Sequence, residues 1–485
     1  MKRFLIFLII PVFVLILYHS ALLTYFAQDD FFTFKVSQTD GSFKQFVNLF
    51  GFHTFQEREI AFYRPIFREA LFNTFYSLFG LNPYPFRILQ FVLLFLNSFL
   101  AYLLIKKFFD NEKLSFFVAF FYAVSSAQIS PLYYLTGGIQ VLGATTFLLL
   151  TLILSFKNLL LAFVMFLLAL ASHELASIIP FLIAAYNFRR LWVTIPFFLV
   201  LFIYLYLEIT KIGFSASEIQ YQPIFNLKTI LNSYMWYMGW ALGLPEMLID
   251  FVFPSFKLNP SLMRYWGNYF IIIFSSFFIS LSLLAFGFIY MLKRRTFFLD
   301  KKMIFFIFWF FISLIPVILL PLHKSTQYLE TGLVAFWTII GLIIFNIYRI
   351  AGLSRIRLER KVVKICIVFL VLSLFALSAT SAILQRNTYW AAERGRYAKQ
   401  LIEQITTTYP NLPKGAVIYF ENDPNYPFIS YEWGSSSKQA AFILNNEDAL
   451  RLVYKDPSIR VYYEDLSKPS DALGGKIYKI TAKIF

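Results

Sequence analysis

The sequence has little charge and almost no cysteine. Charged residues make up 14% of its 485 residues, whereas a soluble protein is about a quarter charged. Cys366 is the single cysteine, so no internal disulfide can form and the redox compartment cannot be inferred from it. The sequence also contains no Asn-x-Ser/Thr acceptor, and it therefore carries no mark of a glycosylated secretory protein.

Familiar chemical motifs are missing too. The four histidines show neither the i,i+4 spacing nor the Cys/His spacing of zinc sites. There is no glycine-rich phosphate loop and no nucleophile elbow. The sequence thus predicts no metal site, and no nucleotide-binding or serine-hydrolase signature points to a function.

Apolar residues are abundant instead. They make up 59% of the chain, and 62 Phe and 30 Tyr bring the aromatic share to 21%. The net charge is +16, but residues 385–485 hold 13 Lys and Arg against 11 Asp and Glu. Most of the excess therefore lies in the apolar part, in short connectors, as in multi-spanning membrane proteins and not as in a nucleic-acid groove. The long run after Lys2 and Arg3 has no cleavage site and is interpreted as a retained anchor.

Hydropathy predicts an all-α polytopic protein with about eleven spans. Basic clusters, such as Lys293–Arg295 and Arg355–Lys364, fall on one side, which the positive-inside rule makes cytoplasmic. The N-terminus is then cytoplasmic and the C-terminus extracytoplasmic. The expected spans are 4–26, 86–105, 114–134, 137–156, 158–172, 174–187, 191–209, 269–291, 303–320, 328–348 and 362–384.

Two external loops are long. In the loop 27–85, Phe43–Phe50 and Pro65–Phe79 are predicted as interfacial helices, the second with Arg68 and Glu69 turned to water. The loop 210–268 is read as a re-entrant or surface-lying segment, and two further spans there would also preserve the parity.

The chain divides into two predicted domains. Residues 1–384 form the transmembrane domain, and 385–485 form a small external α/β domain. In this tail we expect helices at Thr388–Tyr409 and Asn446–Val453, and strands at Ala416–Phe420, Arg460–Tyr463 and Lys476–Ile484.

Four polar groups reach the external face in this topology, and they are the candidates for chemistry. They are Asp29 with Asp30, Tyr63 with Arg64, His173 with Glu174, and the segment from His323 and Lys324 to Tyr328. A carboxylate can deprotonate an acceptor hydroxyl, and cations can neutralise a departing phosphate. Each group also has a simpler interpretation: a solvated helix end for the acids, lipid headgroup binding for Arg64, and a mutual pair for His173 and Glu174.

Several of these residues resemble motifs of multi-spanning, polyprenyl-phosphate-sugar-dependent glycosyltransferases of the C class (GT-C). Tyr63-Arg64-Pro65, Phe79–Pro83 and Phe86-Arg87-Ile88 are similar to the first-loop signature of protein O-mannosyltransferase-like proteins, including bacterial ones. Asp29-Asp30 stands where that family keeps its acidic motif. Ser172-His173-Glu174 resembles a Ser-Lys-Glu motif with His in place of Lys, and Gln327-Tyr328 resembles a late motif that usually contains Arg-Tyr.

The resemblance implies a cell-envelope hexosyltransferase in the cytoplasmic membrane. It would move a sugar, with inversion, from a polyprenyl-phosphate donor to a protein, lipid or glycan acceptor, without a cofactor or divalent metal. Asp29 would be the catalytic base and Asp30 its support, and Tyr63, Arg64, His173, Glu174, His323 and Tyr328 would bind substrate. Two alternatives stay open: a lipid-linked glycan polymerase or ligase, and a lipid-linked sugar flippase or other transporter.

Overall fold

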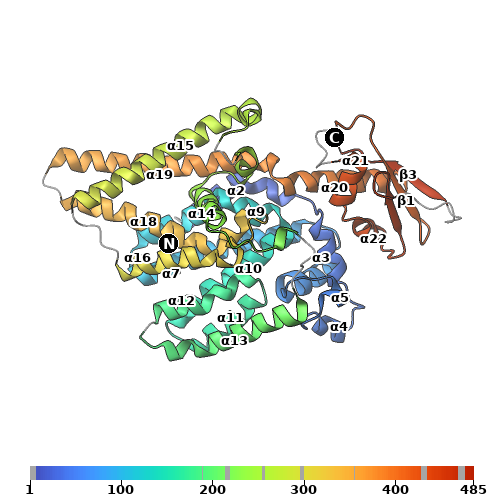
Figure 1. Cartoon of the computed structure of the whole chain (residues 1–485), viewed down its shortest axis with the longest axis horizontal. Helices are drawn as coiled ribbons and strands as arrows, with labels where there is room; N and C mark the ends of the chain where they lie inside the picture. The colour runs from blue at the N-terminus through green and yellow to red at the C-terminus, as the bar shows by residue number, and fades with distance from the viewer. Residues whose placement is uncertain are drawn as a thin grey trace.

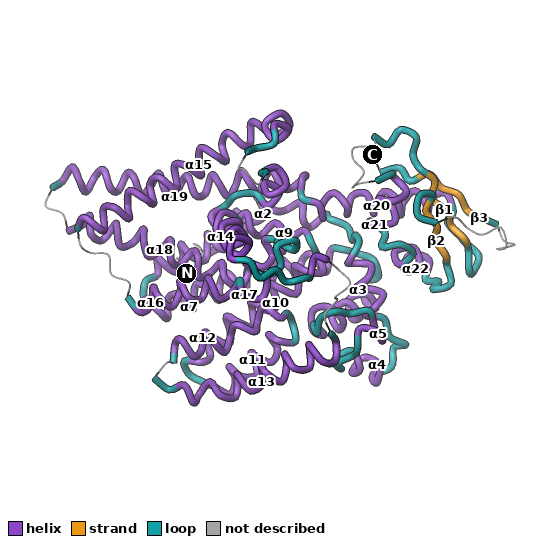
Figure 2. The backbone as a smooth tube through the Cα atoms, viewed as in Figure 1, coloured by secondary structure: helices purple, strands orange, loops and turns teal. Residues whose placement is uncertain are grey.

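The computed structural model describes residues 7–187, 189–213, 219–253, 257–294, 300–353, 356–427, 434–467 and 476–484. Helices dominate these residues, and strands occur near the C-terminus (Figure 2). The basic residues Lys2, Arg3, Arg295 and Arg355, which helped to orient the predicted spans, lie outside the described residues.

The described chain is that of a multi-pass membrane protein. Seven of its helices are long and apolar enough to cross a bilayer, and the bent pair Glu112–Val124 and Ser126–Tyr133 makes an eighth candidate. Shorter apolar helices at Ile9–Leu23, Leu159–Leu170 and Glu174–Tyr186 fall where three further spans were expected. The count of eleven crossings stays a prediction. The seven long candidates are Tyr84–Phe109, Leu135–Ser155, Leu191–Ile212, Pro260–Lys293, Lys301–Ile318, Thr326–Leu353 and Arg357–Thr408.

The bundle is built around α10, which is buried along most of its length and contacts both α7 and α11. Close packing there depends on glycine: a Cβ at Gly138 would lie 2.1 Å from the Pro131 carbonyl oxygen, and one at Gly143 would lie 2.0 Å from the Phe67 ring. The bundle helices are α2 (Ile9–Tyr18), α7 (Tyr84–Phe109), α8 (Glu112–Val124), α9 (Ile129–Tyr133), α10 (Leu135–Ser155), α11 (Leu159–Leu170), α12 (Ile179–Tyr186), α13 (Ile195–Leu207), α15 (Pro260–Lys293), α16 (Lys301–Ser313), α17 (Ile315–Ile318), α18 (Glu330–Leu353) and α19 (Arg357–Thr388).

Long apolar helices on the outside of the bundle leave large side chains uncovered. The helices α15 and α19 pack on each other (Figure 1), yet Phe278 on α15 and Phe369 on α19 are each 60% exposed. Acyl chains would cover such side chains without the cost of contact with water, which agrees with a bilayer environment.

The segment 27–85, between the first two predicted spans, is largely helical, and both of its predicted helices are present. It contains α3 (Asp29–Ser37), α4 (Phe43–Asn48), α5 (Phe55–Arg58), the π-helical turn η2 (Pro65–Ala70) and α6 (Leu71–Phe79). The predicted exposure of Arg68 and Glu69 is wrong, because both side chains are buried and form an ion pair of 2.7 Å. The π-helical geometry of this turn changes which side chains share a face, so a 3.6-residue pattern misplaces them.

The second long loop holds α14 (Leu227–Leu242) and the 3₁₀ turn η8 (Glu246–Phe251). The helix α14 is shorter than the spanning candidates, and it ends at Gly243, whose φ of 129° few other residues adopt. The chain therefore turns back sharply, and η8 carries Glu246 into contact with Ser325 and Thr326.

The C-terminal tail is a small α/β unit at one end of the molecule, beside α3 (Figure 1). It contains α20 (Trp390–Thr408), α21 (Ser436–Ile443), α22 (Asp448–Tyr454), β1 (Val417–Glu421), β2 (Arg460–Tyr463) and β3 (Ile477–Thr481). The strands form a parallel sheet in the order β2-β1-β3. All five predicted elements of the tail are confirmed; α19 ends at Thr388, a few residues beyond the expected boundary at 384.

Candidate functional site

A cavity of about 1330 Å³ opens where the helices of segment 27–85, the bundle and the tail meet. Its wall includes at least one residue from each of the four polar groups singled out in the sequence: Asp29, Arg64, Glu174, and His323 with Tyr328. The expected convergence of these groups on one cavity is therefore confirmed, although they are far apart in the chain.

Asp29 lies at the first position of α3, on the cavity wall. Its Oδ2 accepts a hydrogen bond of 2.6 Å from the hydroxyl of Tyr134, which also lines the cavity. The carboxylate is half-buried and lines the cavity, so it is within reach of a substrate hydroxyl bound there. Asp29 is thus placed as a general base would be.

Asp30 is buried and does not line the cavity. Its carboxylate accepts hydrogen bonds from the backbone N–H and the hydroxyl of Thr136, at 3.0 and 2.8 Å, and from the N–H of Ala27 at 3.2 Å. Burial raises the pKa of Asp30, while Arg87 and these hydrogen bonds oppose the rise. In this arrangement Asp30 attaches the start of α3 to the start of α10.

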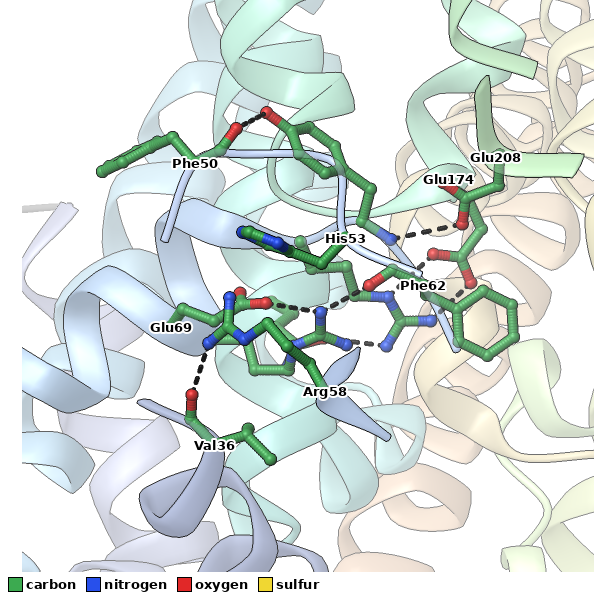
Figure 3. A network of polar contacts seen from close by, with 12 residues as sticks. Val36, Phe50, His53, Arg58, Phe62, Glu69, Glu174 and Glu208 are labelled. Atoms are coloured by element: carbon green, nitrogen blue, oxygen red, sulfur yellow. Dashed lines mark hydrogen bonds and ion pairs between the residues drawn. The ribbon is translucent and has the colours of Figure 1, made fainter. Parts of the chain in front are cut away.

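Arg64 lines the same cavity and is held by two polar side chains. Its guanidinium donates to both carboxylate oxygens of Glu174, at 2.8 and 2.5 Å, and to Oε1 of Gln140 at 2.8 Å. Burial lowers the pKa of Arg64, but the ion pair with Glu174 outweighs it and raises the pKa overall. Arg64 is therefore charged, and Glu174 offsets most of that charge. Figure 3 shows Glu174 and Glu208 close together in this network.

Tyr63 and His173 lie beside the cavity and not on its wall. The Tyr63 ring stacks on Phe52 with centroids 3.9 Å apart, and its hydroxyl donates to the Phe50 carbonyl (Figure 3). His173 is 1% exposed and its Nδ1 accepts from the Leu175 N–H. Burial, helped by the charge of Arg64, lowers the pKa of His173 to about 3, so its ring is neutral.

Lys324 presents an ammonium group to the cavity. Its Nζ donates to the Pro321 carbonyl at 2.8 Å, and it forms no ion pair with the described residues. Burial lowers the pKa of Lys324, a cost that an anionic ligand would offset. The neighbouring His323 ring lies 4.7 Å from Tyr221 and 5.6 Å from Tyr328, centroid to centroid, which makes this wall aromatic as well as basic.

Three more acids line the cavity, Glu59, Glu208 and Glu246, and the last two are hydrogen-bonded there. Glu208 accepts from the Tyr63 N–H at 3.2 Å. Glu246 accepts from the N–H of Thr326 at 2.7 Å and from its hydroxyl. Burial raises the pKa of Glu246 to about 7, against the opposing effect of these hydrogen bonds. Within the described part of the chain, no group of three or more metal-ligating side chains is placed to hold an ion.

The tail closes one side of the cavity with Trp390, Arg394, Phe442 and Asn445. Trp390 packs against Tyr134, with ring centroids 5.1 Å apart, and Tyr134 in turn holds Asp29. The predicted external domain therefore borders the proposed base directly.

Sequence reasoning missed Tyr134, Glu208, Glu246, Trp390 and Arg394. Glu208 carried a usable signal, since it is an acid at the end of an apolar run, as Asp29 is. Glu246 follows the glycines and the proline that break the loop 210–268. The other three had no local signal, because tertiary contacts alone bring them to the cavity.

Comparison of the chain with protein-family models, curated proteins and solved structures finds no match.

Proposed function

We propose that this protein is a membrane glycosyltransferase of the GT-C type, which moves a sugar from a polyprenyl-phosphate donor to an acceptor on the extracytoplasmic face. The supporting observation is the composition of one large cavity: Asp29 and the cations Arg64 and Lys324 all line a volume of about 1330 Å³. A base for the acceptor and cations for a departing phosphate are what such a transfer requires.

Asp29 would take the proton of an acceptor hydroxyl as that oxygen attacks the anomeric carbon. The bond between the anomeric carbon and the phosphate oxygen breaks on the opposite side, and its electron pair leaves with the polyprenyl phosphate. Attack and departure on opposite faces invert the anomeric configuration. Tyr134, which donates to Asp29 Oδ2, orients the carboxylate for this step.

Lys324 and Arg64 would stabilise the phosphate that departs. Arg64 is already neutralised by Glu174, whereas Lys324 forms no ion pair with any described residue. A phosphate in the cavity would therefore gain more from Lys324. We assign His173 and Glu174 to the positioning of Arg64, and Tyr328 and His323 to the wall around the phosphate.

Apolar residues of the same cavity would hold the start of the lipid chain. Phe181, Leu201, Ile312, Pro316 and Leu319 all line it, and they come from helices that the bilayer is expected to surround. A lipid-linked donor needs such a mixed cavity, with a polar end for the sugar phosphate and an apolar end for the prenyl units.

The direct test is transfer of a labelled sugar by the purified full-length protein in lipid vesicles. Donors would be polyprenyl-phosphate hexoses, and products would be separated from the donor lipid. Mass spectrometry of lipids that co-purify with the protein would identify the donor class. Movement of the donor across the vesicle without transfer would instead support the flippase alternative.

A further inference from the structure

The residue that precedes Asp29 has an unusual backbone. Gln28 adopts φ 51° and ψ −113°, in the region that favours glycine. A residue with a Cβ stays there when its surroundings hold it, at a cost of about 1–3 kcal/mol. The question is therefore what holds Gln28.

The tail holds the backbone N–H and the side chain of Gln28, while its carbonyl oxygen accepts from the Phe31 N–H in α3. Its backbone N–H donates to the Ile443 carbonyl oxygen at 2.8 Å, at the end of α21. Its side-chain Oε1 accepts from Nη1 of Arg394 in α20. Two separate elements of the tail thus grip one residue of the first external segment.

Arg394 is itself well fixed. Its guanidinium carbon lies 4.9 Å from the Trp390 ring centroid and 4.7 Å from that of Phe442, so two aromatic rings flank it. It also lies close enough to Asp29 for electrostatic attraction. The adjoining surface is tight as well: a Cβ on Gly395 would lie 2.7 Å from the Tyr25 carbonyl oxygen.

We infer that Arg394 is a positioning residue for Asp29, acting through Gln28. It holds Gln28 in its left-handed conformation and so fixes where α3 begins and where the Asp29 carboxylate points. The tail is then a required wall of the site and not an independent appendage. This role for Asp29 rests on the proposed transferase function, whereas the grip on Gln28 does not.

The test uses full-length protein with Arg394→Ala, Arg394→Lys, Gln28→Gly and the double variant Arg394→Ala with Gln28→Gly. Glycine adopts φ 51° without strain, so Gln28→Gly removes the gripped side chain while the backbone can keep its path. Arg396→Ala is the matched control, since Arg396 lies on the same helix but is exposed and does not line the cavity. The readouts are kcat and KM for the donor, and the melting temperature.

We expect Arg394→Ala and Gln28→Gly each to lower kcat by about 10- to 100-fold, because small displacements of a reacting group cost rate. KM for the donor should stay nearly constant, since the phosphate end of the cavity is untouched. Arg394→Lys should recover part of the loss by donating to Gln28 Oε1. The double variant should be no slower than the worse single variant, as for residues that act through one contact.

A wild-type kcat in Arg394→Ala, or losses that multiply in the double variant, would overturn the inference. If Arg394→Ala is not recovered folded, Gln28→Gly and Arg394→Lys decide by the same criteria. If the wild-type protein transfers no sugar, the proposed function fails. The melting temperatures of the variants then test the contact between Arg394 and Gln28 by itself. A loss of melting temperature in the double variant that is smaller than the sum of the single losses would then support that contact. Strictly additive losses would overturn it.

Discussion

The adjacent residues Asp29 and Asp30 have different surroundings, and this difference indicates different roles. Asp29 is on the cavity wall, where its carboxylate accepts a hydrogen bond from the Tyr134 hydroxyl. Asp30 is buried with three donors around its carboxylate. A carboxylate that does not line the cavity cannot take a proton from a substrate bound there, so Asp29 is assigned the chemistry and Asp30 the support.

Lys324 offers a test of the donor phosphate position. Lys324→Ala removes a charge that no described acid neutralises, and charge-assisted hydrogen bonds contribute about 1.5–3 kcal/mol. We expect kcat/KM for the donor to fall by about 10- to 100-fold, with partial recovery in Lys324→Arg. Steady-state kinetics with varied donor measure this.

Lys228→Ala is the control, because Lys228 is exposed and does not line the cavity. Unchanged donor kinetics in Lys324→Ala would exclude the phosphate from this part of the cavity.

Glu246 predicts a pH dependence of stability. Folding raises its pKa from 4.5 to about 7, so the protonated form is favoured in the folded state. Protonated Glu246 therefore adds to the free energy of unfolding, by at most about 3 kcal/mol. This stabilisation is fully present below the ordinary pKa of 4.5 and is lost as the pH rises through about 7. Glu246→Gln cannot ionise, so its melting temperature should fall less between pH 5 and pH 8 than that of the wild type. Parallel melting curves for the two proteins over this range would contradict the assignment.

At the level of elements, α3 is a short helix whose start is fixed from two sides. Asp30 ties it to Thr136 at the start of α10, and the tail grips Gln28. The position of the Asp29 carboxylate thus depends on contacts among three segments that are distant in the chain.

Asp30→Ala should destabilise the protein. It leaves the N–H groups of Thr136 and Ala27 without an acceptor and the Thr136 hydroxyl with Thr33 alone, and each buried unsatisfied group costs about 1–3 kcal/mol. Asp29→Asn should leave the melting temperature nearly unchanged, because the amide oxygen can still accept from Tyr134. Thermal unfolding in detergent compares the two, and an Asp30→Ala protein as stable as the wild type would remove the proposed support role.

Helices and strands were largely predictable because their signals are local. The tail strands, the interfacial helices and the apolar helices all follow from residue periodicity. The buried pair of Arg68 and Glu69 was not predictable, since a π-helical turn alters the helical face. Asp29 stood out as an acid just past an apolar span, and Arg64 as a charge directly before a predicted interfacial helix. Trp390 and Arg394 did not, because a long-range contact across more than 350 residues brings Arg394 to Gln28.

At the scale of the whole molecule, apolar helices occupy most of the structure and the α/β tail caps one end (Figure 1). The cavity lies where these parts meet, so its chemistry is available on one side of the membrane. The positive-inside rule predicts that this side is outside the cytoplasm.

Topology reporters test this orientation. A reporter fused after Phe485 should be active outside the cytoplasm, and one inserted in 351–361 should be active inside, because basic residues flank that connector. A cytoplasmic signal from the C-terminal fusion would place the cavity on the other face and remove the lipid-linked donor from its reach.

The central claim is best tested by sugar transfer with wild-type and Asp29→Asn proteins side by side. Asparagine keeps the size of the side chain and its hydrogen bond but cannot act as a base. Loss of a general base lowers turnover by about 10²–10⁴-fold. We predict label transfer from a polyprenyl-phosphate sugar by the wild type and a loss of that size in Asp29→Asn, with unchanged folding. Equal transfer by both proteins would contradict the proposed mechanism, and no transfer by either would contradict the proposed function.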